Sequence, residues 1–227
     1  MQEQLLKSSI EYIKEAWGIY TKKENFIFFA RIMTVLVVAT TTLNVTRDYL
    51  YPLDYLQNSR LSNIPMSIGF MIISFLLGII SLWSQTTQYF AVLKMGNPEK
   101  DVFKLGFKYA GEFLLASLAI GIIIMFGLAL LIVPAIIFGV WYSFSLWLVL
   151  DKDLRLRDSL KQSKAMVKGK FWKVLGRLVV FLIPPFVASF SIALIPYIGK
   201  IIYSFITPLF LIPQYLLYKD MSANQSD

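Results

Sequence analysis

Cysteine and histidine are both absent from the 227-residue chain, and charged residues are scarce. Without cysteine, the chain forms neither disulfide bonds nor a cysteine-ligated metal site. Without histidine, it lacks the side chain that most often serves as general base, proton relay or metal ligand near neutral pH. Charged residues make up 16% of the chain and hydrophobic residues 57%, whereas soluble domains carry about 25% and roughly 45–50%. This composition indicates a protein whose solvent is lipid.

Long uncharged runs divide the chain into transmembrane segments. These runs are 32–46, 61–93, 113–150, 178–199 and 201–218. A helix that crosses a bilayer needs about 20 mostly apolar residues, so the run 113–150 fits two spans, with Pro134 between them as a turn. The sequence therefore predicts an all-α polytopic transmembrane helical bundle of six spans. We expect the spans near 27–46, 64–88, 112–132, 134–150, 174–194 and 199–217.

The placement of lysine and arginine predicts how the spans are oriented. Alternate segments collect 18 basic residues on one side of the membrane and 3 on the other. Because basic residues in short loops stay cytoplasmic, we expect a multi-pass protein of the plasma (inner) membrane with both termini in the cytoplasm. The predicted parts are an amphipathic interfacial segment 1–25, a transmembrane domain 26–218 and a cytoplasmic tail 219–227. No nucleic-acid recognition motif accompanies the basic residues, so we assign them to topology and anionic headgroups.

Two segments have the pattern of helices that lie in the membrane interface, and a third has a weaker version of it. The first spans residues 4–22, the second lies in a basic cytoplasmic helix 153–172, and the third begins at Phe103. Their apolar stripes are Leu6, Ile10, Ile13, Trp17 and Tyr20; Leu156, Leu160, Ser163, Val167 and Phe171; and Phe103, Phe107, Ala110 and Leu114. An apolar stripe backed by charges suits the headgroup boundary. Because each copy precedes a pair of spans, the chain could be a threefold repeat. The alternative is that linkers between spans are generally basic and amphipathic.

Span two carries polar side chains on one narrow face. The candidate polar intramembrane face is Ser67, Ser74, Ser81, Gln85 and Gln88. One interpretation is a polar pathway through the membrane, and the other is helix–helix packing, which small residues promote in membrane bundles. Span four has Ala135, Gly139 and Ser143 at i+4 spacing, which also favours packing. No acidic residue lies in the middle of a span, and Glu112, near a span end, could pair with Arg31 or Arg177.

The stretch Ile132–Leu175 contains a motif that is shared with a known family. Its elements are Val133, Pro134, Ala135 and Ile136, then Tyr142 and Asp151, then Ser163, Met166, Val167, Gly169 and Trp172, with Pro208, Leu217, Tyr218 and Asp220 near the end. This pattern resembles that of bacterial six-span proteins that include the membrane domain of some glycerophosphoryl diester phosphodiesterases. Ala135 stands where that family usually has glycine. The resemblance implies a six-span inner-membrane protein of unsettled function. It does not imply phosphodiesterase activity, which belongs to a separate soluble domain.

Two functional hypotheses remain after this reading, and neither is enzymatic. The motifs GxSxG, HExxH and the Gly-rich phosphate loop are absent from the sequence, so we expect no catalytic, cofactor-binding or metal-binding residues. The first hypothesis is a scaffold or envelope-maintenance factor that acts through membrane lipids, a protein partner or a second copy of itself. The candidate contacts for anionic headgroups or a partner are Lys161, Lys164, Lys168, Lys170 and Trp172. The alternative is a transporter or permease for a small or lipidic solute along the polar face of span two.

Overall fold

The computed structural model describes residues 6–51, 64–95, 101–193 and 198–223, and all regular secondary structure among them is α-helical. Six segments are long and apolar enough to cross a membrane. They are Lys23–Leu50, Ile68–Leu93, Ala110–Leu130, Ile132–Lys152, Phe171–Phe190 and Ile201–Ala223. Their ends differ from the predicted ones by six residues at most. The all-α six-span prediction is therefore confirmed, and the protein has the helices of a multi-pass membrane protein.

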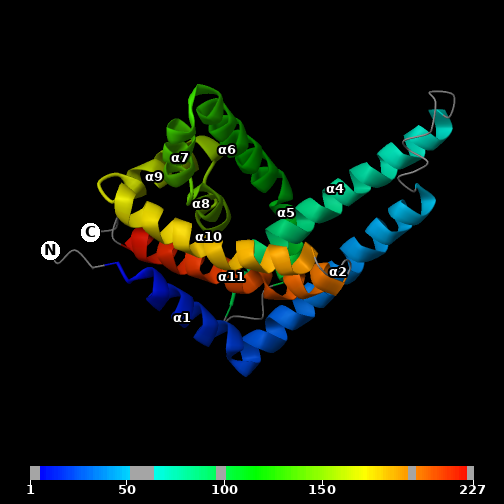
Figure 1. Ribbon diagram of the computed structural model, residues 1–227, viewed down its shortest axis with the longest axis horizontal. Helices are drawn as coiled ribbons and strands as arrows, with labels where there is room; N and C mark the ends of the chain where they lie inside the picture. Colours follow the sequence, from blue (N-terminus) through cyan, green and yellow to red (C-terminus); the bar gives the residue numbers. More distant parts are fainter. Residues whose placement is uncertain (1–5, 52–63, 96–100, 194–197, 224–227) are drawn as a thin grey trace.

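The helices form three hairpins, each preceded by a short helix (Figure 1). The short helices are α1 (Ser9–Thr21), α5 (Val102–Lys108) and α9 (Leu156–Val167). The hairpins are α2 (Lys23–Leu50) with α4 (Ile64–Leu93); α6 (Ala110–Leu130) with α7 (Ile132–Trp141) and α8 (Ser145–Lys152); and α10 (Phe171–Ala193) with α11 (Ile198–Ala223). The three hairpins diverge in Figure 1, and each short helix lies near the point where one hairpin gives way to the next. Because two spans lie between each short helix and the next, all three short helices lie on the same side of the membrane.

The short helices connect the hairpins in a closed ring. Helix α5 packs on α4 of the hairpin before it, and α9 packs on α7 and α8 of the hairpin before it. Helix α1 has no preceding hairpin, and it packs on α10 and α11, the last one. The short helix of each unit therefore packs on the hairpin of the unit before it, and the short helix of the first unit packs on the hairpin of the last. This cyclic packing supports the predicted repeat of a short helix followed by a hairpin.

Local sequence signals define where the short helices begin. Ser8 caps α1 with a capping box, since its hydroxyl accepts from the Glu11 amide at 3.2 Å and the Ser8 amide donates to the Glu11 carboxylate at 2.6 Å. Asp101 caps α5 by accepting from the amides of Phe103 and Lys104. Between α9 and α10, the chain turns at Gly169, which has a φ of +82°. Only glycine adopts this left-handed conformation without strain.

The turn between spans three and four lies at Leu131, and the expectation that Pro134 forms it was wrong. Leu131 is extended between α6 and α7, whereas Pro134 lies in the first turn of α7. A proline in a first turn is tolerated because its missing amide has no partner inside the helix. The two helices cross closely here, since a Cβ on Gly127 would lie 2.7 Å from the Ala135 Cα. This contact explains the small residue at Ala135.

The fourth span is broken, in contrast to the continuous helix predicted over 134–150. Helix α7 ends at Trp141 and α8 begins at Ser145. Ser163 of α9 connects the two sides of the break, because its hydroxyl donates to the Trp141 carbonyl at 2.7 Å and accepts from the Phe144 amide at 3.2 Å. A side chain from outside the span thus satisfies backbone groups that the interrupted helix leaves free. Sequence periodicity within the span could not reveal this.

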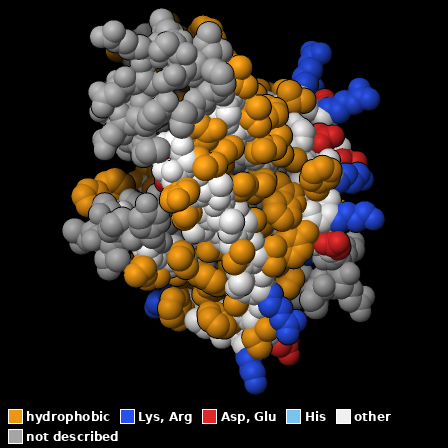
Figure 2. All heavy atoms as spheres, turned by 90° about the vertical axis from the view of Figure 1, so that its right-hand side faces the viewer, with side chains coloured by type: hydrophobic (Ala, Val, Ile, Leu, Met, Phe, Trp, Pro, Cys, Tyr) orange, Lys and Arg blue, Asp and Glu red, His pale blue; other side chains and the backbone are white. Residues whose placement is uncertain are grey.

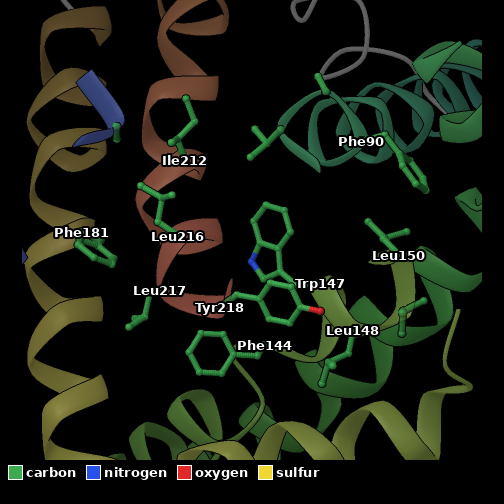
Figure 3. Close-up of a cluster of buried hydrophobic side chains, with 14 of the residues drawn as sticks. Phe90, Phe144, Trp147, Leu148, Leu150, Phe181, Ile212, Leu216, Leu217 and Tyr218 are labelled. Atoms are coloured by element: carbon green, nitrogen blue, oxygen red, sulfur yellow. The ribbon is translucent and has the colours of Figure 1, made fainter. Parts of the chain in front are cut away.

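The core lies where the second helices of the three hairpins meet (Figure 3). Trp147 of α8 is almost fully buried at its centre. Its ring centroid lies 4.6 Å from that of Tyr89 in α4 and 5.4 Å from that of Tyr215 in α11. Aromatic pairs at such separations stabilise beyond the area they bury. Tyr218 also stacks on Trp147, and its hydroxyl donates to Asp151 at 2.7 Å.

The faces of the short helices differ from their predicted roles. In α9 the predicted stripe packs against the protein, since Ser163 and Val167 are fully buried. In α1 the buried residues are Tyr12, Ala16 and Tyr20, of which only Tyr20 belongs to the predicted stripe. Ile10 and Trp17 of that stripe are 63% and 58% exposed, as expected of side chains that face the membrane interface. The third predicted stripe is interrupted, because α5 ends at Lys108 and α6 starts at Ala110. Hydrophobic periodicity located the α1 helix but did not distinguish its protein-facing side from its exposed side.

Candidate functional site

The basic surface of α9 is the strongest candidate for a functional contact that the sequence predicted. Lys161, Lys164 and Lys168 are all exposed, and they project from the face opposite the buried Ser159, Ser163 and Val167. The Lys164 ammonium lies 4.0 Å from the centroid of the Trp141 ring, a cation–π distance. None of these three lysines forms a salt bridge within the described part of the chain. Lys161 and Lys168 are therefore exposed without an internal ion pair, whereas the Lys164 ammonium lies against the Trp141 ring.

Trp172 extends this surface beyond the end of α9. The Gly169 turn separates α9 from α10 and leaves Trp172 in the first turn of α10, where its side chain is 79% exposed. Lys170 lies between the two helices and is half-buried, so it belongs to the turn rather than to the exposed cluster. Tryptophan with an exposed ring beside basic residues is typical of the boundary between lipid and water. Four of the five predicted contact residues, Lys161, Lys164, Lys168 and Trp172, are thus exposed within one short stretch of the chain.

The other two short helices show the same combination of an exposed aromatic ring and exposed lysines. In α1, Trp17 is 58% exposed and Lys14 is exposed on the same helix. In α5, Phe107 is 71% exposed and both Lys104 and Lys108 are exposed. Figure 2 shows lysine and arginine side chains gathered mainly along one side of the molecule, beside a broad hydrophobic face. This is the charge distribution of a membrane protein with one strongly basic side.

Hydrogen bonds hold α1 to the hairpin on which it packs. The Tyr12 hydroxyl donates to Asp220 of α11 at 2.7 Å, and the Tyr20 hydroxyl donates to the Phe205 carbonyl at 2.8 Å. Burial, together with the hydrogen bond to Asp220, raises the pKa of the Tyr12 phenol well above its usual value. The Arg177 guanidinium donates to the carbonyls of residues 6 and 7 just before α1. Because their partners are up to 208 positions apart, these contacts escaped sequence reasoning.

Two of these contacts correct or extend particular expectations. Arg177 binds backbone carbonyls, and no salt bridge joins it to Glu112 among the described residues. Tyr12 was not recognised at all, because it lies off the stripe that the sequence emphasises. The i, i+4, i+8 spacing of Tyr12, Ala16 and Tyr20 is the signal that could have identified this face.

The predicted polar face of span two lies along the continuous helix α4, and its members differ in exposure. On α4, Ser74 and Ser81 are half-buried, Gln85 is exposed, and the Gln88 amide lies 3.4 Å from the Ser84 hydroxyl. The side chain of Ser67 lies outside the described residues. Three hollows among the described residues, on α5, beside α10 and between α1, α10 and α11, are lined by other side chains. The described members of this face therefore place polar groups along α4 without lining any of these three hollows.

Comparison of the chain with models of protein families, with curated proteins and with solved structures gave no significant match. The resemblance to the membrane domain of glycerophosphoryl diester phosphodiesterases therefore stays a prediction. Four of its motif residues nevertheless have a clear structural role. Ser163 closes the break in the fourth span, Gly169 makes the turn into α10, and Asp151 and Asp220 accept hydrogen bonds from tyrosines of neighbouring units.

Proposed function

We propose that this protein is a non-enzymatic membrane scaffold, with an envelope-maintenance role, that acts by binding anionic lipid headgroups on its basic side. In this proposal the basic side faces the cytoplasm of the plasma (inner) membrane, and both termini lie there. The observation that carries it is the exposed cluster of Lys161, Lys164 and Lys168 on α9, next to the exposed ring of Trp172. A basic residue near an anionic membrane surface contributes about 1 kcal/mol to attraction.

The buried side of α9 supports this proposal as well. The helix is held in place by Ser163, which bridges the fourth span, and by the burial of Met166 and Val167. The lysines are therefore presented by a fixed element at the membrane boundary rather than by a loose linker. Fixed presentation lowers the entropy that is lost when a headgroup is bound. The same argument applies to α1, which hydrogen bonds fasten to α11.

The test is the lipid composition around the protein after detergent-free extraction into native lipid discs. Neutralising the cluster as K161Q/K164Q/K168Q should lower the enrichment of anionic lipids over the bulk membrane. The matched control is K161R/K164R/K168R, which keeps the charge and should keep the enrichment. Equal enrichment in the glutamine variant and the wild type would refute the proposal. A stoichiometric protein that copurifies with wild type and is lost with the glutamine variant would assign the lysines to a protein partner instead.

Orientation must be checked in the same variants, because removing three basic residues weakens the bias that sets topology. The chain contains no cysteine, so a single cysteine introduced at an exposed position reports its side of the membrane without background. Labelling from the cytoplasmic side at the end of α11 should be the same in all variants. This measurement also tests the proposed cytoplasmic location of that end directly.

The alternative function is transport of a small or lipidic solute along α4. One observation favours it: the amide of Gln85 is exposed on a helix that spans the membrane, where uncovered polar groups are costly. Replacing Ser74, Ser81 and Gln85 with alanine or leucine should then abolish uptake or export in a protein that still folds. Retained flux in such a folded variant would remove this alternative.

A further inference from the structure

Helix α5 is firmly anchored although it has only 7 residues. Its inner face packs on α4, where a Cβ on Gly106 would lie 3.0 Å from the Thr87 Cα and closer still to the Thr87 hydroxyl. The Trp83 indole of α4 donates to the Phe103 carbonyl at 3.0 Å. Asp101 caps the helix through two backbone amides. Figure 1 shows α5 where α4 and α6 come together, so it lies at the junction of two hairpins.

The outer face of α5 forms a hollow with an apolar wall and a basic rim. The hollow is open to its surroundings and has a volume of about 650 Å³, and its surface is almost entirely apolar. It is lined by Asp101, Lys104, Leu105, Phe107 and Lys108. This volume is comparable with the roughly 300–1,000 Å³ of sites that bind small ligands. Phe107 is 71% exposed, as are other large apolar side chains of the protein that face lipid or a ligand in a membrane.

The charges around this hollow favour an anion. Lys104 and Lys108 are one helical turn apart and both are exposed, and neither forms a salt bridge in the described part of the chain. The Lys108 ammonium lies 4.9 Å from the centroid of the Tyr109 ring, a contact that leaves its charge without a counterion. The carboxylate of Asp101 already accepts two backbone hydrogen bonds at the helix start. Lysine places its alkyl stem along apolar surface and keeps its ammonium group in water. The rim therefore carries two positive ammonium groups and one carboxylate, and that carboxylate is already hydrogen-bonded in the helix cap.

We propose that this hollow is a binding site for one anionic phospholipid, with its phosphate against Lys104 and Lys108 and an acyl chain along Leu105 and Phe107. The apolar wall and the basic rim match the two chemically different parts of such a lipid. A free phosphate would leave the wall uncovered, and a neutral lipid would leave the two ammonium groups unpaired. The site rests on the proposed function, because both require the basic side to face anionic lipid. It goes further by naming a single bound molecule at the junction of two hairpins.

The experiment is native mass spectrometry of the full chain, purified in a mild detergent and titrated with phosphatidylglycerol or phosphatidylcholine. Wild type should retain one phosphatidylglycerol more tightly than any other lipid. K104Q/K108Q should weaken that binding about thirtyfold, since each basic residue contributes about a factor of five. K104R/K108R should restore it, and F107S should weaken it without changing the preference for the anionic headgroup. Glycerol phosphate, which has the headgroup charge but no chains, should not displace the lipid.

The matched control is K22Q/K23Q, which removes two exposed lysines between α1 and α2, away from the hollow. This variant should bind the lipid as wild type does. Equal loss in K22Q/K23Q and K104Q/K108Q would overturn the proposal, because it would show only a general charge effect. Displacement by glycerol phosphate would overturn it in favour of a free phosphate site. If K161Q/K164Q/K168Q loses the bulk enrichment of anionic lipids but keeps the single bound lipid, both proposals are supported. If that variant keeps the bulk enrichment while K104Q/K108Q loses the single bound lipid, only the site on α5 is supported.

Discussion

Replacing Ser163 with alanine should destabilise the protein although it removes only one oxygen atom. The Ser163 hydroxyl bonds the Trp141 carbonyl and the Phe144 amide at the break in the fourth span. Phe144 is 1% exposed, so water cannot easily replace the lost acceptor. A buried backbone group left without a partner costs about 1–3 kcal/mol. In membrane proteins the average loss is smaller, about 0.6 kcal/mol per bond, because alternative partners exist. Two bonds at the membrane average give about 1 kcal/mol, and two at the lower limit for buried groups give about 2 kcal/mol, so we expect S163A to lower the free energy of unfolding by about 1–2 kcal/mol.

The matched control for S163A is a serine one helical turn away. Ser159 is also fully buried in α9, but its hydroxyl donates only to the Leu156 carbonyl of its own helix, at 2.8 Å. That carbonyl belongs to the helix backbone, and S159A leaves no group at the break without a partner. We expect S159A to change the free energy of unfolding by less than about 0.5 kcal/mol, the range of substitutions that disturb no particular feature. The comparison holds the helix, the burial and the removed atom constant.

The measurement is reversible unfolding in mixed micelles, followed by circular dichroism while the share of denaturing detergent rises. S163A should unfold at a clearly lower denaturant share than wild type, and S159A should unfold with wild type. S163T keeps a hydroxyl at the same position and should recover part of the loss. If S163A and S159A unfold together, Ser163 does not stabilise the break, and the structural account of this motif residue is wrong.

Two further predictions concern the turn after α9 and the attachment of α1. Gly169 has a φ of +82°, and a Cβ there would touch nothing within 4 Å, so G169A should lower the free energy of unfolding by about 1–2 kcal/mol from backbone strain alone. The control is G176A, because Gly176 lies in a helix with open space around it. In thermal unfolding this variant should be neutral or stabilised by up to about 1 kcal/mol. The pKa of Tyr12 is raised in the folded protein by burial and by its hydrogen bond to Asp220. The folded state thus holds the phenol proton more tightly, and this contribution to stability is present below a pH of about 10 and is lost as pH rises further. Y12F should make the decline of the unfolding free energy above that pH shallower, and an unchanged slope would contradict the assignment.

The number and the positions of the spans were the part of the structure that the sequence predicted best, whereas the orientation stays a prediction. Spans of about 20 apolar residues and a strong asymmetry of basic loops are properties of continuous segments, so they can be read without knowing which helices touch. The short helices α1 and α9 were also predicted, because amphipathic periodicity is a local property. The exposed lysines of α9 follow from the same periodicity. They lie opposite Ser163 and Val167, which the sequence had already placed on one stripe.

The features that sequence reasoning missed depend on contacts between distant segments. The break after Trp141 has no proline or glycine at the break itself, and it exists because Ser163 of another helix supplies the missing hydrogen bonds. The inner face of α1 is defined by Tyr12, whose partner is Asp220. The hollow on α5 was missed for another reason. The third stripe was treated as one helix, whereas the chain changes direction between Lys108 and Ala110 and leaves Phe107 exposed.

The three units are alike in their buried core and differ in the aromatic residues that they expose. The second helix of each hairpin contributes one aromatic residue to the core, and the residue two positions before it is a threonine, a serine or a proline. The aromatic residues are Tyr89, Trp147 and Tyr215, and the preceding residues are Thr87, Ser145 and Pro213. At the first of these places α5 approaches so closely that only glycine fits opposite. The exposed aromatic residues near the three short helices have no common position, because Trp17 and Phe107 lie inside α1 and α5, whereas Trp172 lies in α10 after α9. Each hairpin therefore contributes one aromatic residue to the shared core, whereas the exposed rings and lysines differ from one unit to the next. This difference is the physical reason to expect α5 and α9 to bind lipid in distinct ways.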